Sequence, residues 1–215
     1  MGAQAAWIAV GLTLAVLLGY EALLLLLPRR RPQRSTPARH AGLREAWFRA
    51  VSEQKGSELL AVQTLRNSLM SATLLASTAA LALMGTVSLA APLLHALDGA
   101  AGRAGIGPRL ALELALLALL LASLVSALMA VRLFNHAGFI GGMPVDSDAR
   151  ARWTEAGVRY VRRAGLLYGV ALRQLVLAVP VVVAILLPAA GPLAAALVAG
   201  VLHSVDRFDA DQAGG

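Results

Sequence analysis

Cysteine is absent from the sequence, lysine occurs once, and charged side chains of both signs are scarce. Only 14% of the 215 residues are charged, whereas a typical soluble domain has about 25%. Without cysteine the chain has no disulfides, no thiolate zinc sites and no cysteine-held iron–sulfur clusters. The shortage of charge, together with long apolar runs, excludes a soluble enzyme.

Apolar residues take the place of the missing charges. They make up 58% of the chain, and the mean hydropathy is +0.70. A helix that crosses a bilayer needs about 20 mostly apolar residues. Four stretches reach this length, at about residues 5–27, 67–91, 110–134 and 165–187. The sequence therefore predicts an all-α, polytopic membrane protein with a four-helix transmembrane bundle.

One more apolar segment, residues 193–202, follows a break that contains proline and glycine. At about 1.5 Å per residue it is too short to cross a bilayer alone. We expect an interfacial or half-span helix here, with a fifth span as the alternative. Residues 1–205 then form a single integral membrane domain, followed by an acidic tail over residues 206–215.

The basic residues predict the orientation. Segments 28–66 and 135–164 are rich in arginine, whereas segment 92–109 and the tail contain few basic residues. The positive-inside rule then places the two basic segments in the cytoplasm and both termini on the outer side. The Arg-rich, Lys-poor composition suggests a bacterial cytoplasmic (inner) membrane. We attribute the net charge of +7 to basic loops beside anionic lipid headgroups, and expect no nucleic-acid partner.

A short cytoplasmic amphipathic helix is predicted over residues 41–54. Its apolar side chains recur at helical spacing: Leu43, Ala46, Trp47, Ala50 and Val51. This helix either packs on the cytoplasmic end of the bundle or lies at the membrane surface. Gly56 and Ser57 then break the chain, and Ser57 is expected to cap a helix that continues into the second span.

The second span has a polar face and an opposite face of small residues. With residues about 100° apart, the polar side chains that share one side are Gln63, Arg66, Asn67, Ser71, Thr73, Ser77 and Thr78. Because polar groups in hydrocarbon need partners, we expect this face to look toward companion helices. Alternatively, Arg66 and Asn67 end the span at the headgroups, and the hydroxyls bond to carbonyls of their own helix.

The third span ends in three more polar side chains, which share the predicted cytoplasmic layer with the start of the second span. The combined layer is polar and net-positive, which suits an anion or a lipid headgroup. The predicted ligand-binding residues are Gln63, Arg66, Asn67, Ser71, Arg132, Asn135 and His136.

Two charged residues lie deeper in the predicted spans. Glu21 in the first span and Arg173 in the fourth are both roughly 10–12 Å from the cytoplasmic end at about 1.5 Å per residue. An unpaired charge there is costly, so an intramembrane ion pair between them is predicted. The pair either fixes the register of the helices or takes part in a proton or ion relay.

Motifs of catalysis and metal binding are missing from the sequence. The four histidines have no HxxH or HExxH spacing, and there is no P-loop, GxGxxG or GxSxG. General acid–base chemistry would also need a positioned cluster of His, Glu and Asp. We therefore expect no metal, no cofactor and no enzymatic activity.

Two segments carry a family resemblance. AVQTLRNSLMSATLLAST (residues 61–78) and RLFNHAGFIGGMP (residues 132–144) resemble the two signature patches of a bacterial and plant membrane family. The family is catalogued as domain of unknown function 599, and the resemblance covers roughly residues 5–200. It implies a four-span helical protein with no assigned biochemical function.

Two functions fit these features best, and a membrane enzyme comes third because no positioned His, Glu and Asp cluster is found. The first is transport of ions or small solutes through a channel-like protein with a polar cytoplasmic vestibule. One four-span protomer leaves little room for a pore, so this function implies a homo-oligomer. The alternative is a non-catalytic accessory or assembly subunit that binds lipid or a larger membrane complex.

Overall fold

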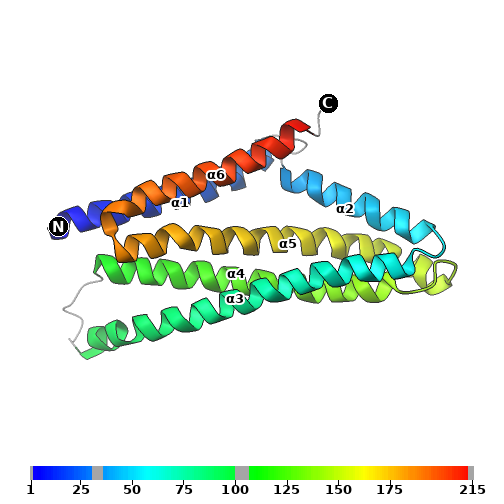
Figure 1. Cartoon of the computed structure of the whole chain (residues 1–215), viewed down its shortest axis with the longest axis horizontal. Helices are drawn as coiled ribbons and strands as arrows, with labels where there is room; N and C mark the ends of the chain where they lie inside the picture. Colours follow the sequence, from blue (N-terminus) through cyan, green and yellow to red (C-terminus); the bar gives the residue numbers. More distant parts are fainter. Residues whose placement is uncertain (1, 31–35, 100–106, 213–215) are drawn as a thin grey trace. The chain divides into compact units, whose positions relative to one another are not determined.

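The computed structural model describes the backbone of residues 2–30, 36–99 and 107–212, and the side chains of residues 2–24, 26, 40–92 and 107–205. All regular elements in these residues are helical (Figure 1). They are α1 (Ala3–Arg30), α2 (Thr36–Glu53), α3 (Glu58–Gly99), α4 (Pro108–Gly141), α5 (Asp148–Leu186), the 3-10 helix η2 (Pro188–Ala190) and α6 (Gly191–Gln212). The acidic side chains predicted for the tail lie outside the described side chains.

Five of the described helices are long and apolar enough to cross a membrane. Their candidate spans are Ala3–Leu24, Glu58–Pro92, Pro108–Gly141, Asp148–Leu186 and Pro188–Val205. The chain is an all-α polytopic membrane protein, as predicted. By length and composition, the candidates number one more than the four predicted spans, which agrees with the alternative of a fifth span.

The extra candidate span arises at the C-terminal end of the chain. Gly191 and Pro192 begin α6 instead of interrupting it. Proline is tolerated in the first turn of a helix because the N–H it lacks there would have no intrahelical partner. The helix therefore extends on both sides of the predicted segment 193–202, and together with η2 it gives a candidate span of 18 residues, Pro188–Val205.

Contacts divide the chain into two compact units. Unit 1 comprises Met1–Pro32, Ala79–Ala122 and Arg173–Gly215, and unit 2 comprises Gln33–Thr78 and Ser123–Leu172. Helices α3, α4 and α5 each contribute residues to both units. Each unit has its own buried apolar cluster.

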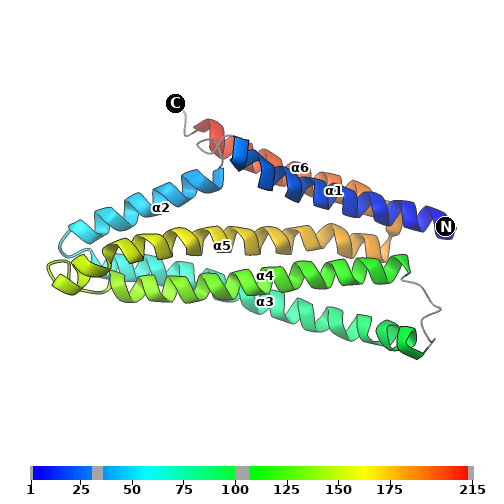
Figure 2. The same ribbon diagram turned by 180° about the vertical axis from the view of Figure 1, so that it is seen from behind.

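Unit 1 contains a pair of helices, α1 and α6. They lie side by side, with their first residues at the same end of the pair (Figures 1 and 2). A Cβ added at Gly191 would lie 2.6 Å from Oγ1 of Thr13, so glycine allows α6 to begin close to α1. The core around this pair is aliphatic and includes Val10, Leu17, Leu112, Leu116, Leu177 and Val181.

Unit 2 contains α2 packed on α5. Phe48 of α2 is completely buried and lies against Gly157 of α5, where an added Cβ would be 2.6 Å from the ring Cζ. One helical turn away on α2, the Arg44 side chain crosses Gly165, where an added Cβ would be 2.7 Å from Cζ of the guanidinium. Of the two predicted positions for this helix, packing on other helices is therefore the one found in unit 2.

The predicted apolar face of α2 is only partly correct. Leu43 is 69% exposed, and Ala46 and Ala50 are exposed as well. Val51 is buried as predicted, but the completely buried side chain is Phe48, which the predicted face did not include. The reason is Gly157 of α5, which has no side chain and so leaves room for the Phe48 ring. This contact determines which side of α2 faces the other helices of unit 2.

The turn between α2 and α3 is closed by Ser57. Gly56 adopts a φ of 79°, a left-handed conformation that favours glycine at the end of a helix. The Ser57 hydroxyl lies 2.6 Å from the carbonyl of Val51 and 2.7 Å from that of Gln54, so it donates to the end of α2. The expected cap on the first amides of α3 is not the contact that this hydroxyl makes.

Candidate functional site

The polar face predicted on α3 is exposed in unit 2. Its residues Gln63, Arg66, Asn67 and Ser71 all lie on the outer side of the helix. The side that packs on other helices carries small and apolar residues, namely Ala61, Leu65, Ala72, Leu75 and Ala76. Within the described part of unit 2, these polar side chains are therefore not buried against another helix, although Arg66 borders a groove beside α4.

The hydroxyl groups on this face bond to their own helix. Ser71 lies 3.0 Å from the carbonyl of Asn67, Thr73 lies 2.9 Å from that of Leu69, and Thr78 lies 2.9 Å from that of Leu74. Such bonds satisfy a hydroxyl in an apolar environment without a second helix. These bonds agree with the alternative prediction, in which the hydroxyls bond to carbonyls of their own helix.

The predicted polar layer is divided between two grooves of unit 2. Arg132 and His136 line a groove between α4 and α5. Arg66 and Asn135 line a second groove between α3 and α4. The other predicted ligand-binding residues line neither groove; these are Gln63, Asn67 and Ser71.

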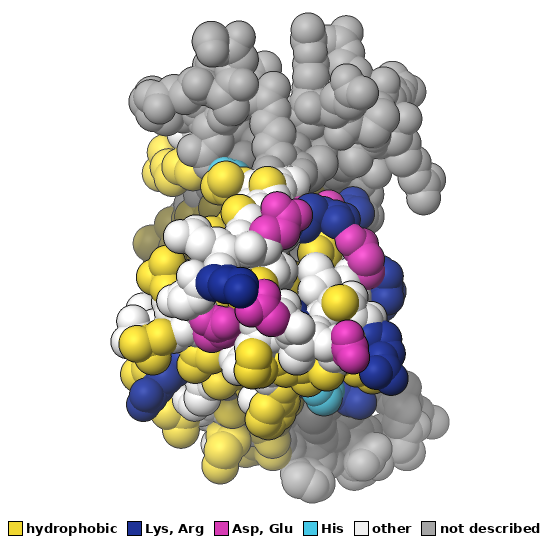
Figure 3. All heavy atoms as spheres, turned by 90° about the vertical axis from the view of Figure 1, so that its right-hand side faces the viewer, with side chains coloured by type: hydrophobic (Ala, Val, Ile, Leu, Met, Phe, Trp, Pro, Cys, Tyr) yellow, Lys and Arg dark blue, Asp and Glu magenta, His cyan; other side chains and the backbone are white. Residues whose placement is uncertain are grey.

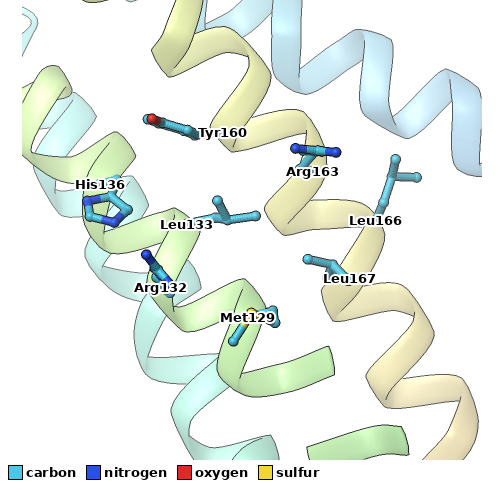
Figure 4. A pocket seen from close by; sticks show the side chains of 8 residues that line it. All are labelled: Met129, Arg132, Leu133, His136, Tyr160, Arg163, Leu166 and Leu167. Atoms are coloured by element: carbon cyan, nitrogen blue, oxygen red, sulfur yellow. The ribbon is translucent and has the colours of Figure 1, made fainter. Parts of the chain in front are cut away.

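The α4–α5 groove has a volume of about 560 Å³ and brings together side chains from two helices (Figure 4). From α4 come Met129, Arg132, Leu133 and His136, and from α5 come Tyr160, Arg163, Leu166 and Leu167. This volume lies within the range of small-molecule sites, which is about 300–1,000 Å³.

Polarity changes along this groove from one end to the other. His136 and Tyr160 lie at the end nearest the α4–α5 loop, with their ring centroids 5.8 Å apart. Arg132 and Arg163 follow from opposite walls, and Met129 and Leu167 lie at the far end (Figure 4). The groove therefore offers cations at one end and an apolar surface at the other.

The two arginines of the α4–α5 groove have no partner within the described residues. Neither Arg132 nor Arg163 makes an ion pair or hydrogen bond to another described side chain. Arg162, the chain neighbour of Arg163, differs because its Nε lies 3.2 Å from Oε1 of Glu45. One of two adjacent arginines thus holds α2 against α5, and the other leaves its charge available to a ligand.

Other charged side chains of unit 2 are paired with one another. Arg49 of α2 forms two hydrogen bonds with the Glu155 carboxylate of α5, and these bonds raise the pKa of Arg49 above its ordinary value. Lys55, in the turn between α2 and α3, lies 2.7 Å from Asp146 in the loop between α4 and α5. Figure 3 shows basic and acidic side chains interspersed on the face that includes the helix-connecting loops. These ion pairs link parts of unit 2 to one another, and no ligand is needed to explain them.

A buried arginine, Arg150 near the start of α5, was not singled out by the sequence. It is 1% exposed and donates to the carbonyls of Ile140 and Met143 and, over 3.0 Å, to Oγ of Ser52. Its guanidinium also lies 5.5 Å from the centre of the Phe48 ring. Arg150 therefore ties the end of α4 to α2. Because these contacts require α2 to be docked, the only signal in the sequence is an arginine at the start of a helix.

Unit 1 places Glu21 and Arg173 next to each other. Arg173 Nε lies 3.8 Å from Oε1 of Glu21, and the amide of Gln174 donates to the same oxygen over 3.0 Å. Both charged side chains are largely buried, at 28% and 22% exposure. The cluster can stabilise the packing of α1 against α5.

A second acidic residue, Glu113 of α4, is buried in unit 1. It is 2% exposed, and its Oε1 accepts a hydrogen bond of 3.0 Å from Nε of Arg109. Its other oxygen has no partner among the described atoms. The sequence places this carboxylate at the start of an apolar run, where the four-residue spacing from Arg109 is the available signal.

Among the described residues, no group of three or more His, Asp or Glu side chains could hold a metal ion. The candidate site is therefore defined by cations and apolar walls.

The comparison with protein families decides the relationship that the two sequence patches suggest. A family model described as "Protein of unknown function, DUF599" matches residues 8–210. The chain belongs to this family. No curated protein and no solved structure matches the chain. Membership in this family confirms the resemblance that residues 61–78 and 132–144 indicate. The family description assigns no function.

Proposed function

We propose that this membrane protein binds an anionic phospholipid of the cytoplasmic leaflet in the α4–α5 groove. The observation that carries the proposal is the pair Arg132 and Arg163, which face one groove from two helices without a described partner. A lipid phosphate is a strong acceptor for guanidinium groups. In this function the protein is a non-catalytic accessory or assembly subunit of the membrane.

The order of side chains along the groove supports a phospholipid over a soluble anion. A phosphate between Arg132 and Arg163 leaves His136 and Tyr160 beside the rest of the headgroup. An acyl chain then follows the apolar end toward Met129, in the direction in which α4 and α5 continue as candidate spans. A soluble anion would make no use of this apolar end.

Native mass spectrometry of the purified protein tests the proposal. Phosphatidylglycerol and phosphatidylcholine with identical acyl chains are titrated separately, so only the headgroup charge differs. We expect phosphatidylglycerol to bind more tightly. Replacing both Arg132 and Arg163 by Ala should weaken its binding by at least roughly tenfold, because two charge-assisted contacts are lost.

A variant with the same change in charge serves as the control. Arg152 and Arg159 are exposed, lie on α5 and do not line the groove. Replacing both by Ala should leave phosphatidylglycerol binding nearly unchanged. Equal binding of the two lipids, or an equal loss in the two double variants, would reject a specific site in the groove.

Transport is the second candidate, and the exposed polar face of α3 favours it. Gln63 and Asn67 lie on a candidate span and point away from the other helices of unit 2. Polar side chains in lipid need partners, which a second copy of the chain would supply in a homo-oligomer. Liposome flux of protons, ions and organic anions tests this function. Flux should disappear, and oligomers dissociate, when both residues are replaced by Leu; absence of flux in the unaltered protein excludes it.

A further inference from the structure

We infer that the α3–α4 groove is a second, separate site, which binds a single carboxylate on a long apolar chain, such as a fatty acid. This site goes beyond the proposed phospholipid function and shares no residue with the α4–α5 groove. Its volume is about 740 Å³, and its polar side chains are Arg66 of α3 and Asn135 of α4.

The polar groups of this groove fit one carboxylate. Arg66 is its only cation and has no ion pair or hydrogen bond to another described residue. A guanidinium matches the two oxygens of a carboxylate with two parallel hydrogen bonds. The Asn135 side chain adds an amide donor, and no carboxylate of the protein lines the groove to compete. One guanidinium with planar donors suits a singly charged, planar carboxylate. The lipid phosphate proposed for the α4–α5 groove is instead flanked by two arginines.

The walls of the groove fit an apolar chain. The residues beside Arg66 and Asn135 are Val62, Leu65, Leu69, Phe134, Phe139 and Met143. Phe139 is 69% exposed although it lies on this wall, so a bound chain would cover apolar surface that is otherwise uncovered.

Two glycines shape the groove. A Cβ added at Gly138 would meet nothing within 4 Å, so the α4 wall is open at this position. At Gly142, directly after α4, an added Cβ would lie 3.3 Å from Cγ2 of Val62, so the chain approaches α3 closely at this point of the groove. A larger side chain at Gly138 would therefore fill the groove without displacing another helix.

Photolabelling of the full-length protein tests the site. The protein is reconstituted in phosphatidylcholine liposomes with a palmitic acid analogue that carries a photoreactive diazirine, and labelled peptides are mapped by mass spectrometry. We expect labelling within residues 62–69 and 134–144. Oleic acid should compete, and its methyl ester, which has the same chain without the charge, should not.

Three variants test whether labelling depends on the charge and the free space of the groove. Arg66→Ala should reduce labelling of these peptides about tenfold, as expected for the loss of a charge-assisted double hydrogen bond. Arg66→Lys should recover only part of it, because an ammonium lacks the planar pair of donors. Gly138→Leu should block labelling while the helix is retained, since leucine has a higher helix propensity than glycine.

The matched control is Arg152→Ala, which removes an exposed arginine outside the groove and should leave labelling unchanged. Competition by the methyl ester, or labelling that survives both Arg66→Ala and Gly138→Leu, would overturn the site. Phosphatidylglycerol binding is measured on the same variants and should stay intact. A failure of this inference is thereby distinguished from a failure of the phospholipid proposal, which depends on Arg132 and Arg163.

Discussion

Units 1 and 2 are held together by different kinds of contact. The core of unit 1 consists mainly of Leu, Val and Ala side chains, and among the described residues its polar contacts include the cluster of Glu21 with Arg173 and Gln174. Unit 2 packs Phe48 on a glycine, buries Arg150 and links α2 to α5 through ion pairs.

The difference shows which unit can be stabilised by pairs of charged side chains. In lipid the hydrophobic effect does not drive helices together, so they are held by van der Waals packing, and a charge must be paired internally. Ion pairs with half-exposed partners, such as Arg49 with Glu155, suit a surface in contact with water. The ion pairs of unit 2 are therefore of the kind expected beside water and not in hydrocarbon.

The largest effect is expected from Arg150→Ala in unit 2. The substitution leaves the Ile140 carbonyl and the Ser52 hydroxyl without their buried donor, and it removes the contact with Phe48. The free energy of unfolding should fall by roughly 2–4 kcal/mol. Hydrogen exchange should show the loss in peptides of unit 2 first. Equal loss of protection in α1 and α6 would contradict separate cores.

The next effect is expected from Glu21→Arg in unit 1. Two cations would then face each other, and stability in detergent should fall by about 2 kcal/mol or more. Combining Glu21→Arg with Arg173→Glu restores opposite charges and should recover most of the loss in a thermal unfolding assay. If the double variant is no more stable than the single one, the 3.8 Å contact does not stabilise unit 1.

A smaller effect is expected from Gly157→Ala in α5. An added Cβ would meet the Phe48 ring at 2.6 Å, so overpacking should outweigh the gain in helix propensity by about 1 kcal/mol. Gly169→Ala on the same helix is the control, because a Cβ there meets nothing within 4 Å. That control should be stabilised slightly, and a stabilised Gly157→Ala would show that α2 is not seated on α5 at this point.

The smallest effect is expected from Arg49→Ala. The side chain is 48% exposed and its partner Glu155 is 59% exposed, so solvent and salt screen the pair. The unfolding midpoint should hardly change, and any shift should vanish at high salt. A large, salt-independent loss would place this pair among the contacts that determine the fold of unit 2.

Much of the fold follows from local patterns in the sequence. The apolar runs predict four of the candidate spans because the length of a membrane helix depends only on its own residues. The long helix α3 also begins where the break at Gly56 predicts it. The sequence predicts one span fewer than the number of candidate spans. The reason is that a proline in the first turn of a helix has the same sequence signature as a proline that ends one.

The candidate site could be predicted only in part, because it depends on which helices meet. Arg132 and His136 stand out as polar residues at the end of an apolar run, and both line the α4–α5 groove. Arg162 and Arg163 look equivalent in the sequence, and only the docking of α2 separates the paired side chain from the unpaired one. The exposed side of α3 could not be predicted either, since a polar face and a small-residue face can each turn inward.

The common direction of α1 and α6 bears on the two ends of the chain. Five crossings, counted from the candidate spans, would leave the ends in different compartments, whereas the four-span prediction puts both outside. A phosphatase that is active only after export, and a fluorescent protein that matures only in the cytosol, distinguish the two cases when fused to either end. With the basic segments inside, the exported reporter should work at the start of the chain and the cytosolic one at its finish.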